Sequence, residues 1–278
     1  MDSLRRLQLA EKEILRSVTE FCSEHGLRYV VMGGTLLGAV RHGGFIPWDD
    51  DVDIAMPRSD YERFLTLAKS RFNGVDTPFN VLNYKEDVDH IYYFTRVVDK
   101  RVTLIDKSSV KEKTQFAWID VFPLDGMPKN ALVRALHKIS LLHARLMFQY
   151  SRFDDIVSVK TQKRPLHEKL LIAIGKIFNV QKIISNKKAL MRLDKRLKKY
   201  PFELSEYAVN FMGAGKFKEM HKRSLYEDVV SYKFEDLTVN GVRNSHEWLT
   251  AMYGDYMTLP NEKDRNKHFT SDIKVCDE

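Results

Sequence analysis

The feature of this sequence that most restricts its fold is an acidic segment with an alternating pattern. Four of the five positions from 49 to 53 are aspartate: Asp49, Asp50, Asp51 and Asp53. Acidic and aliphatic residues then alternate, and this two-residue period predicts a strand over residues 51–56. Asp51 and Asp53 would share one face of the strand, while Val52 and Ile54 would enter a core on the other. Because the two carboxylates would repel each other, the segment predicts a cation between them, and oxygen ligands favour Mg²⁺ or Mn²⁺.

Two other interpretations of the acidic segment are weaker. Short runs of charge are usually solvated turns, but the interleaved aliphatic residues and the flanking Phe45 and Trp48 are untypical of a turn. A calcium loop starting at Asp49 would need glycine at its sixth position, where the sequence has Ile54, and glutamate at its twelfth, where it has Asp60. We therefore interpret the segment as a metal-binding strand, with Asp49 as a third candidate ligand.

A glycine pair precedes the acidic segment. Gly33, Gly34 and Thr35 follow a short β-rich run, residues 27–32, and stand at the start of a brief helix. Glycines at such a position let backbone amides approach phosphate oxygens, and a helix N-terminus favours an anion. The stretch lacks the lysine of a Walker loop and the spacing of a dinucleotide-binding loop, so its significance comes from its closeness to the acidic strand.

A further carboxylate, Asp120, stands among apolar residues in a predicted strand over residues 116–122. A buried carboxylate without a partner would be costly, so Asp120 is expected to bind a metal or to act as a base. A surface aspartate on an edge strand is the alternative. Asp125, which stands beside Gly126, is interpreted as a turn residue.

The remaining periodicities define the expected elements. Helices are expected at residues 4–22, 36–40, 61–71, 130–150, 166–179, 181–199 and 245–253, and strands at 51–56, 79–82, 92–98, 102–105 and 116–122. With 278 residues, 44% of them hydrophobic, the chain can form one large domain or two closely packed ones. We expect an α+β fold with a catalytic core over residues 1–128, in which helices flank a mixed sheet, and a helical, basic part over residues 129–278.

Charge is distributed unevenly along the chain. Residues 134–200 contain 17 Lys and Arg against 4 Asp and Glu, within a chain of net charge +7. Such a segment suits an anionic partner: a nucleic acid, a lipid surface or a phosphorylated substrate. Aromatic residues are sparse in it, which disfavours RNA, and no nucleic acid is expected. An apolar stripe, Leu170, Leu171, Ile174, Ile177 and Phe178, suggests a basic amphipathic helix on anionic lipid; packing of this stripe onto the core is the alternative.

Cysteine usage and hydropathy bear on location. The two cysteines, Cys22 and Cys276, are too few for a disulfide framework and fit a reducing cytosol, and Cys22 is expected to be a buried, inert thiol. Residues 1–20 lack the apolar segment of a signal peptide, and the longest apolar run, residues 170–174, is far shorter than a membrane span. We expect a cytoplasmic protein, with peripheral contact at the inner face of the cell membrane left open.

Three stretches of the sequence resemble the signature of the LicD family, bacterial phosphorylcholine transferases related to the fukutin-related proteins. They are residues 33–54, residues 120–126, and residues 253–260 followed by Arg265 and His268. The resemblance implies a nucleotidyltransferase-like core. It also implies transfer of phosphocholine, or a related phospho-alcohol, from a CDP-alcohol such as CDP-choline. The acceptor would be a sugar hydroxyl of a lipid-linked teichoic-acid or lipopolysaccharide precursor, and CMP would be released.

The resemblance also implies roles for individual residues. In the nucleotidyltransferase superfamily paired carboxylates hold a divalent metal and a third can deprotonate the attacking hydroxyl, so the expected catalytic residues are Asp51, Asp53 and Asp120. Asp120 would be the base or a further metal ligand. The expected substrate-binding residues are Gly33, Gly34, Thr35, Arg41, His42, Trp48, Asp49, Tyr256, Arg265 and His268, and the expected metal ligands are Asp49, Asp51 and Asp53. Trp48, Trp118 and Tyr256 are candidates to bind choline, a quaternary ammonium, with core packing as the alternative for each.

Other classes of function remain open on the sequence. One is a different nucleotidyltransferase-fold activity on a small molecule. Another is a metal-dependent glycosyltransferase, which also uses Asp-x-Asp but does not require the upstream Gly-Gly-Thr. A third is a membrane-binding or RNA-binding module that acts through residues 134–200 without catalysis. Release of CMP from CDP-choline in the presence of Mg²⁺ would separate the enzymes from the binding module.

Overall fold

A mixed β-sheet forms the centre of the protein. The computed structural model describes residues 3–87, 90–106, 113–152, 172, 184–262, 265 and 276–277. The strands lie in the order β1 (Val30–Val31), β2 (Asp53–Pro57), β5 (Lys113–Met127), β4 (Thr95–Asp106) and β10 (Cys276–Asp277). β3 (Phe79–Leu82) pairs with β4, while β6 (Tyr207–Val209) pairs with β5 and β7 (Met220–Lys222). β2 and β5 run parallel and the neighbouring pairs are antiparallel, which confirms the expected mixed sheet.

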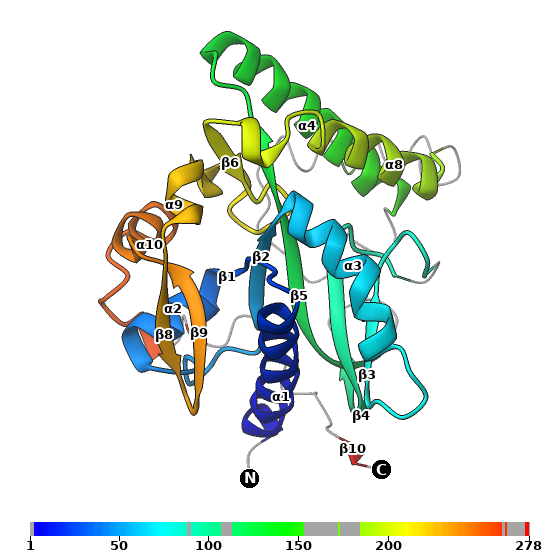
Figure 1. Ribbon diagram of the computed structural model, residues 1–278, viewed down its shortest axis with the longest axis vertical. Helices are drawn as coiled ribbons and strands as arrows, with labels where there is room; N and C mark the ends of the chain where they lie inside the picture. The colour runs from blue at the N-terminus through cyan, green and yellow to red at the C-terminus, as the bar shows by residue number, and fades with distance from the viewer. Residues whose placement is uncertain are drawn as a thin grey trace.

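Helices cover this sheet. α1 (Ser3–Glu24) packs against β4 and β5, and α3 (Arg58–Phe72) packs against β2, β3 and β5. α2 (Gly33–His42) begins directly after β1. The expected helices at 130–150 and 181–199 correspond to α4 (Ala131–Ser151) and α8 (Asn186–Leu197), which lie side by side along one end of the molecule (Figure 1). The expected helix at 166–179, with its apolar stripe, lies outside the described residues.

The chain beyond α8 returns to the N-terminal elements. It forms η1 (Phe202–Leu204), η2 (Lys216–Glu219), α9 (Arg223–Glu227), the hairpin of β8 (Val229–Phe234) and β9 (Leu237–Val242), and α10 (Ser245–Tyr253). In Figure 1 the hairpin and α10 gather beside α2, on the side of the sheet away from α3. Phe234, Trp248 and Leu249 join the same hydrophobic core as Ile14 and Val31. The division at residue 128 stays a prediction, and the two parts share both a sheet and a core.

Two local expectations differ from the structure. The expected strands at 92–98 and 102–105 belong to one strand, β4, whose pairing with β5 shifts register between Asp99 and Thr103. Asp125 is not a turn residue, because it lies within β5 and is 2% exposed. Its carboxylate accepts two hydrogen bonds from the buried Arg58, at 2.7 Å from Nε and 2.6 Å from Nη2. A charged partner 67 residues away, rather than a turn, therefore accounts for this aspartate.

Burial determines the state of Cys22, which is 1% exposed within the core. Burial raises the pKa of its thiol to about 12, so the expectation of a buried, inert thiol is confirmed. None of the helices in the described part of the chain combines the length and the apolar character that crossing a membrane requires.

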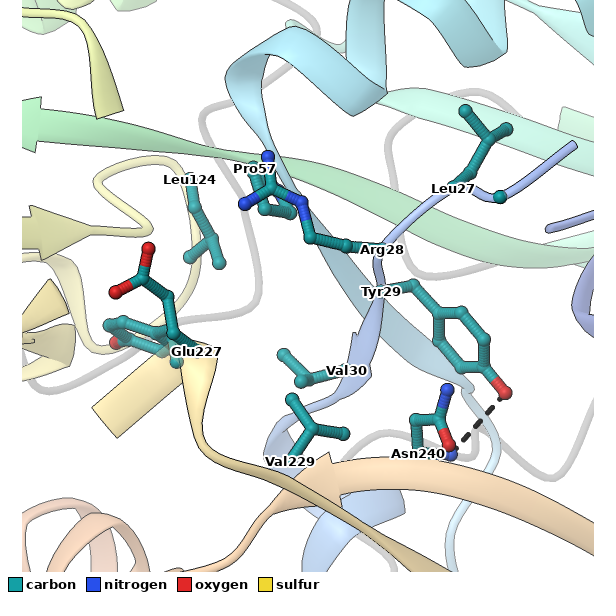
Figure 2. Close-up of a pocket in the computed structure, with 11 residues that line it drawn as sticks. Leu27, Arg28, Tyr29, Val30, Pro57, Leu124, Glu227, Val229 and Asn240 are labelled. Carbon is teal, nitrogen blue, oxygen red and sulfur yellow. Dashed lines mark hydrogen bonds between the residues drawn. The ribbon is translucent and has the colours of Figure 1, made fainter. Parts of the chain in front are cut away.

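One cavity of about 550 Å³ lies between β1 and the β8–β9 hairpin (Figure 2). Two of its polar side chains have partners. Arg28 donates to Asp60 at 2.6 Å, and the Tyr29 hydroxyl accepts from the backbone N–H of Asn240 at 3.3 Å. Its walls are otherwise mainly apolar, as Val30, Val229 and Leu124 show in Figure 2. We interpret this cavity as a packing gap between the N-terminal strands and the hairpin.

Candidate active site

The glycine pair makes room for two carboxylates. α2 starts at Gly33, whose φ of +58° is a left-handed conformation that favours glycine. A Cβ atom at Gly33 would lie 2.8 Å from Oδ2 of Asp53, and one at Gly34 would collide with Oδ2 of Asp49. Any larger residue at either position would therefore displace an acidic side chain, so the two motifs depend on each other.

Asp53 is held by its backbone. Its N–H donates to the buried Thr35 hydroxyl at 2.9 Å, and its carbonyl accepts from the N–H of Met32 at 3.0 Å. In the parallel pairing of β2 with β5, Asp53 lies directly opposite Asp120. The two carboxylates that the sequence places 67 positions apart therefore stand on neighbouring strands, on the same face of the sheet.

The acidic segment forms a cluster that can hold a metal ion. Asp49, Asp50 and Asp51 each offer a carboxylate oxygen, and these oxygens lie within 4.8 Å of one another. Gln8 of α1 fixes the start of the segment, because its Nε2 donates to the carbonyl of Asp49 at 2.9 Å and to that of Ile46 at 3.3 Å. Asp50 was not among the expected ligands, although it belongs to the same acidic run.

Burial and mutual repulsion act on these acids. Burial, Asp51 and Asp50 raise the pKa of Asp49 to about 8. Burial, Asp51 and Asp120 raise the pKa of Asp53 well above its usual range. Carboxylates with raised pKa values in a cavity are typical of a site that binds cations or transfers protons.

A cavity of about 660 Å³ opens in front of these acids. Six of the expected site residues line it: Gly33, Gly34, Trp48, Asp49, Asp51 and Asp53. The opposite wall was not foreseen from the sequence. It consists of residues of the 210–219 segment and of α10: Asn210, Gly213, Ala214, Gly215, Lys216, Lys218, Glu219, Trp248, Met252 and Tyr253. The signal that could have found it is the Gly-Ala-Gly-Lys stretch at 213–216.

The 210–219 segment folds around the carboxylate of Glu219. The backbone N–H of Gly215 donates to Glu219 at 2.8 Å, and that of Gly213 donates to Asn210 at 3.0 Å. Burial raises the pKa of Glu219 to about 7. Lys216 has φ of +51°, in the left-handed region, and both Lys216 and Lys218 are exposed on the cavity wall. The lining of the cavity thus combines the carboxylates of Asp49, Asp51 and Asp53 with the ammonium groups of two lysines.

Asp120 is buried behind the cavity rather than on its wall. Its Oδ1 accepts from Nε of Arg96 at 2.9 Å, and burial raises its pKa to about 6 despite that contact. The guanidinium of Arg96 lies 4.0 Å from the ring centre of Tyr92 and 4.3 Å from that of Trp118. Trp118 therefore packs on Arg96, away from the cavity, and the role of Asp120 as base or ligand stays a prediction.

The other expected substrate-binding residues in the described part of the chain lie outside the cavity wall. Arg41 donates to the carbonyl of Tyr256, and His42 meets the Trp48 ring edge-on at 6.2 Å. The guanidinium of Arg265 lies 4.6 Å from the centre of the Trp48 ring. Thr35 lies behind Asp53, as described above. His268 lies outside the described residues.

Glu11 of α1 is a further acid near this site that was not expected from the sequence. It is fully buried, at 0% exposure. Burial, with Asp51, Asp50, Asp49 and Asp120 as neighbours, raises its pKa well above the usual range. A signal for it exists in the sequence, because Glu11 occupies the apolar stripe of α1 between Leu7 and Ile14.

Comparison with known proteins places this architecture in a family. Residues 26–145 match the family described as LicD/FKTN/FKRP, nucleotidyltransferase domain. The chain is 30% identical to lipopolysaccharide cholinephosphotransferase LicD of Haemophilus influenzae over 284 residues, which covers 98% of each chain. It is 28% identical to an uncharacterized protein of Rickettsia typhi over 57% of this chain and 49% of that protein. It is also 47% identical to human ribitol 5-phosphate transferase FKRP over 51 residues, 18% of this chain and 10% of that protein.

The α+β fold, the acidic cavity and these similarities define a phosphotransferase. The chain belongs to the LicD family, as its near full-length similarity to a LicD protein shows.

Proposed function

We propose that the protein transfers phosphocholine, or a related phospho-alcohol, from a CDP-alcohol to a sugar hydroxyl of a cell-surface glycan precursor, teichoic acid or lipopolysaccharide. The acceptor oxygen forms a bond to the phosphorus that carries the alcohol, the bond from that phosphorus to the bridging oxygen breaks, and CMP leaves. One observation carries the proposal: carboxylates and two lysines line one cavity of about 660 Å³ in a LicD-family chain. A cavity of this size suits a ligand as large as a CDP-alcohol.

The residues present fit a divalent cation. The oxygens of Asp49, Asp50 and Asp51 lie within 4.8 Å of one another, and an all-oxygen donor set favours Mg²⁺ or Mn²⁺. In the proposal Asp49, Asp51 and Asp53 hold the ion. When bound, it would neutralise charge on the phosphate oxygens. Gly33 and Gly34 keep the space into which these acids project.

The lysine wall complements the carboxylates. Lys216 and Lys218 would bind the outer oxygens of the pyrophosphate. The aromatic side chains on the cavity, among them Trp48 and Tyr253, offer faces that attract a quaternary ammonium. Asp120 would accept the proton of the acceptor hydroxyl or supply a further metal ligand.

A donor screen tests the proposal. The purified chain is incubated with a panel of CDP-choline, CDP-ethanolamine and CDP-linked polyols in Mg²⁺ or Mn²⁺, with an acceptor glycan extract, and CMP release is followed by mass spectrometry. We expect CMP from one CDP-alcohol and none from the Asp51→Asn variant. Absence of CMP with every CDP-alcohol, or turnover of a different nucleotide only, would contradict the proposal.

We also propose that the enzyme contacts an anionic membrane through α4. The solvent side of this helix is apolar: Leu132, Leu136 and Ile139 are 71%, 60% and 63% exposed. Exposed cations lie where the end of the adjacent α8 meets this part of α4: Lys195 and Lys199 are exposed there, and Arg196 donates to the carbonyl of Ser140 at 2.7 Å. Apolar residues flanked by cations suit an anionic lipid surface, because the apolar side chains enter the interface and the cations attract the headgroups.

The inner side of α4 reaches the wall of the active site. Arg145 donates to the carbonyl of Phe211 at 2.7 Å, and the ammonium of Lys138 lies 5.1 Å from the centre of the Phe217 ring. A membrane at the outer side of α4 would therefore lie close to the 210–219 wall of the cavity. This placement suits an acceptor that is linked to a lipid.

Liposome co-sedimentation tests the membrane contact. We expect binding to anionic vesicles that weakens with salt and is lost in the Leu136→Asp, Ile139→Asp double variant. Val75→Asp is the matched control, because Val75 is 99% exposed between α3 and β3, outside α4. Equal binding of the double variant and the control would contradict a role for α4. Failure of the wild-type protein to sediment would argue for a polyanionic acceptor free in solution.

A further inference from the structure

Glu11 is a buried side chain whose negative charge would be costly at its position. It is 0% exposed, and neither of its side-chain oxygens has a hydrogen-bond partner among the described residues. Burying a carboxylate without compensation costs several kcal/mol or more, so native proteins pair such groups, protonate them or bind a cation to them. Which of the three applies at Glu11 decides what α1 contributes to the enzyme.

The position of α1 turns Glu11 toward the acidic segment. Gln8, three residues earlier on the same face of the helix, donates to the carbonyls of Asp49 and Ile46. Leu7 and Ala10 pack with Ala117 of β5. Glu11 is thereby enclosed between the acidic segment and β5.

The charges that Glu11 meets there are negative. Asp51, Asp50, Asp49 and Asp120 act on it. Arg96 on β4 donates to Asp120 and Gln115. No basic side chain of the described residues donates to Glu11, which leaves a proton or a metal ion among the three.

We infer that Glu11 is part of the divalent-cation site, which it reaches from the buried side of Asp51. Two observations support this: the oxygens of Asp49, Asp50 and Asp51 lie within 4.8 Å of one another, and the oxygens of Glu11 lack hydrogen-bond partners among the described residues. Asp51 also lines the cavity, whereas Glu11 does not. Glu11 is not one of the three acids whose oxygens lie this close together, so its side chain would turn toward Asp51 when the cation binds, and the cavity side would stay open to phosphate oxygens.

This assignment makes α1 part of the active site. α1 precedes the segment that matches the LicD/FKTN/FKRP domain, which starts at residue 26. The inference rests on the proposed metal dependence. Its test therefore measures metal binding directly, without a donor or an acceptor.

Glu11→Gln separates a cation ligand from a protonated acid, because glutamine closely matches the shape of a neutral glutamic acid. We expect Glu11→Gln to bind Mn²⁺ about 10–100-fold more weakly than wild type in isothermal titration calorimetry. In EDTA the variant should melt at the same temperature as wild type or higher, because a repelling carboxylate is gone. Saturating Mn²⁺ should reverse that order. Glu20→Gln, at an exposed position on the same helix, is the control and should match wild type throughout.

Three outcomes are decisive. Equal Mn²⁺ affinity of Glu11→Gln and wild type would overturn the inference and assign Glu11 a structural role as a neutral acid. Should Glu11→Gln fail to fold, Glu11→Asp, which keeps the charge on a shorter side chain, tests the same point. We expect it to bind Mn²⁺ less tightly than wild type, and equal affinity would again overturn the inference. Absence of Mn²⁺ binding by folded wild-type protein would overturn the proposed metal site as a whole.

Discussion

Strand β5 carries two buried carboxylates, Asp120 and Asp125, five residues apart and in different electrostatic surroundings. Asp125 is matched by Arg58, whose Nε and Nη2 donate to its two oxygens at 2.7 and 2.6 Å, and Arg58 also donates to the Tyr93 hydroxyl at 3.0 Å. Its charge is neutralised by the fold itself. Asp120 has a contact with Arg96, but it also lies opposite Asp53 and near Asp51, and burial raises its pKa to about 6 despite the contact.

The difference separates structural from functional burial of charge. A carboxylate that only supports the fold gains nothing from repulsion, so it is paired, as at Asp125. In the proposed function, carboxylates that bind a cation must remain available to it. Burial and neighbouring aspartates raise the pKa values of Asp49, Asp53 and Glu11. The five predictions below test this contrast, beginning with the largest expected effect.

The largest effect is expected at the aspartates that line the cavity. Asp51→Asn and Asp53→Asn should each reduce turnover by several orders of magnitude, since each removes a charged oxygen ligand. Circular dichroism and thermal melting should show an intact fold, and in EDTA the variants should be at least as stable as wild type. A variant that keeps a near-normal rate at saturating Mg²⁺ would contradict the metal assignment.

Asp120→Asn should lower the rate by roughly 10²–10⁴-fold, the range for loss of a general base. Calorimetric titration with Mn²⁺ then distinguishes the two roles: unchanged affinity indicates a base, and weaker affinity indicates a ligand. Unchanged catalysis would contradict both.

Changes to the Arg58–Asp125 pair should lower the stability of the protein rather than its catalytic rate. Asp125→Ala or Arg58→Ala leaves one charge buried without its main partner, which costs about 3–5 kcal/mol. Urea unfolding should show this loss, and kcat measured well below the melting temperature should stay close to wild type. The double variant Arg58→Met, Asp125→Leu should recover much of the stability. A large loss of kcat in folded single variants would mean that the pair also serves catalysis.

The contrast also shows where sequence reasoning succeeds. The acidic strand, the glycine pair and the strand of Asp120 are local patterns, and the structure brings Gly33, Gly34, Asp49, Asp51 and Asp53 to one cavity. The alternation correctly predicts a strand with Asp53, but β2 begins at Asp53 rather than at Asp51, so Asp49 and Asp51 reach the cavity from the segment before the strand.

The features that the sequence did not predict depend on contacts between residues that are far apart in the chain. Arg58 and Asp125 are 67 positions apart, so Asp125 could be interpreted only from its neighbour Gly126, and that interpretation was wrong. Lys216 and Lys218 line the same cavity as the acids because the C-terminal part of the chain packs on the N-terminal core. Periodicity defines which residues face a core, but it does not define what they meet there.

A smaller, pH-dependent effect on stability is expected from Asp49 in the metal-free protein. The pKa of Asp49 rises from 3.8 to about 8 on folding, so the stability associated with its protonated form is full below pH 3.8 and is lost as pH rises through about 8. In EDTA the melting temperature should therefore fall between pH 5 and pH 8.5, by a few degrees, and saturating Mn²⁺ should reduce that fall. Asp49→Asn should flatten the slope. A slope identical in wild type and Asp49→Asn would show that other groups cause it.

The smallest effect is expected on the lysine wall, where the groups are exposed and solvent screens them. Loss of the Lys216 or Lys218 side chain should raise the KM for the donor by roughly tenfold, the loss of one charged hydrogen bond, with little change in kcat. Lys218→Ala is a simple truncation. At Lys216 the backbone has φ of +51°, so Lys216→Gly removes the side chain without imposing strain, whereas alanine would confound the result. Lys222→Ala, an exposed lysine of β7 away from the cavity wall, is the control and should leave KM unchanged. Because the interaction is ionic, added salt should shrink the difference between wild type and the two lysine variants. Equal KM values for these variants, the control and wild type would mean that the carboxylate side of the cavity binds the donor without the opposite wall.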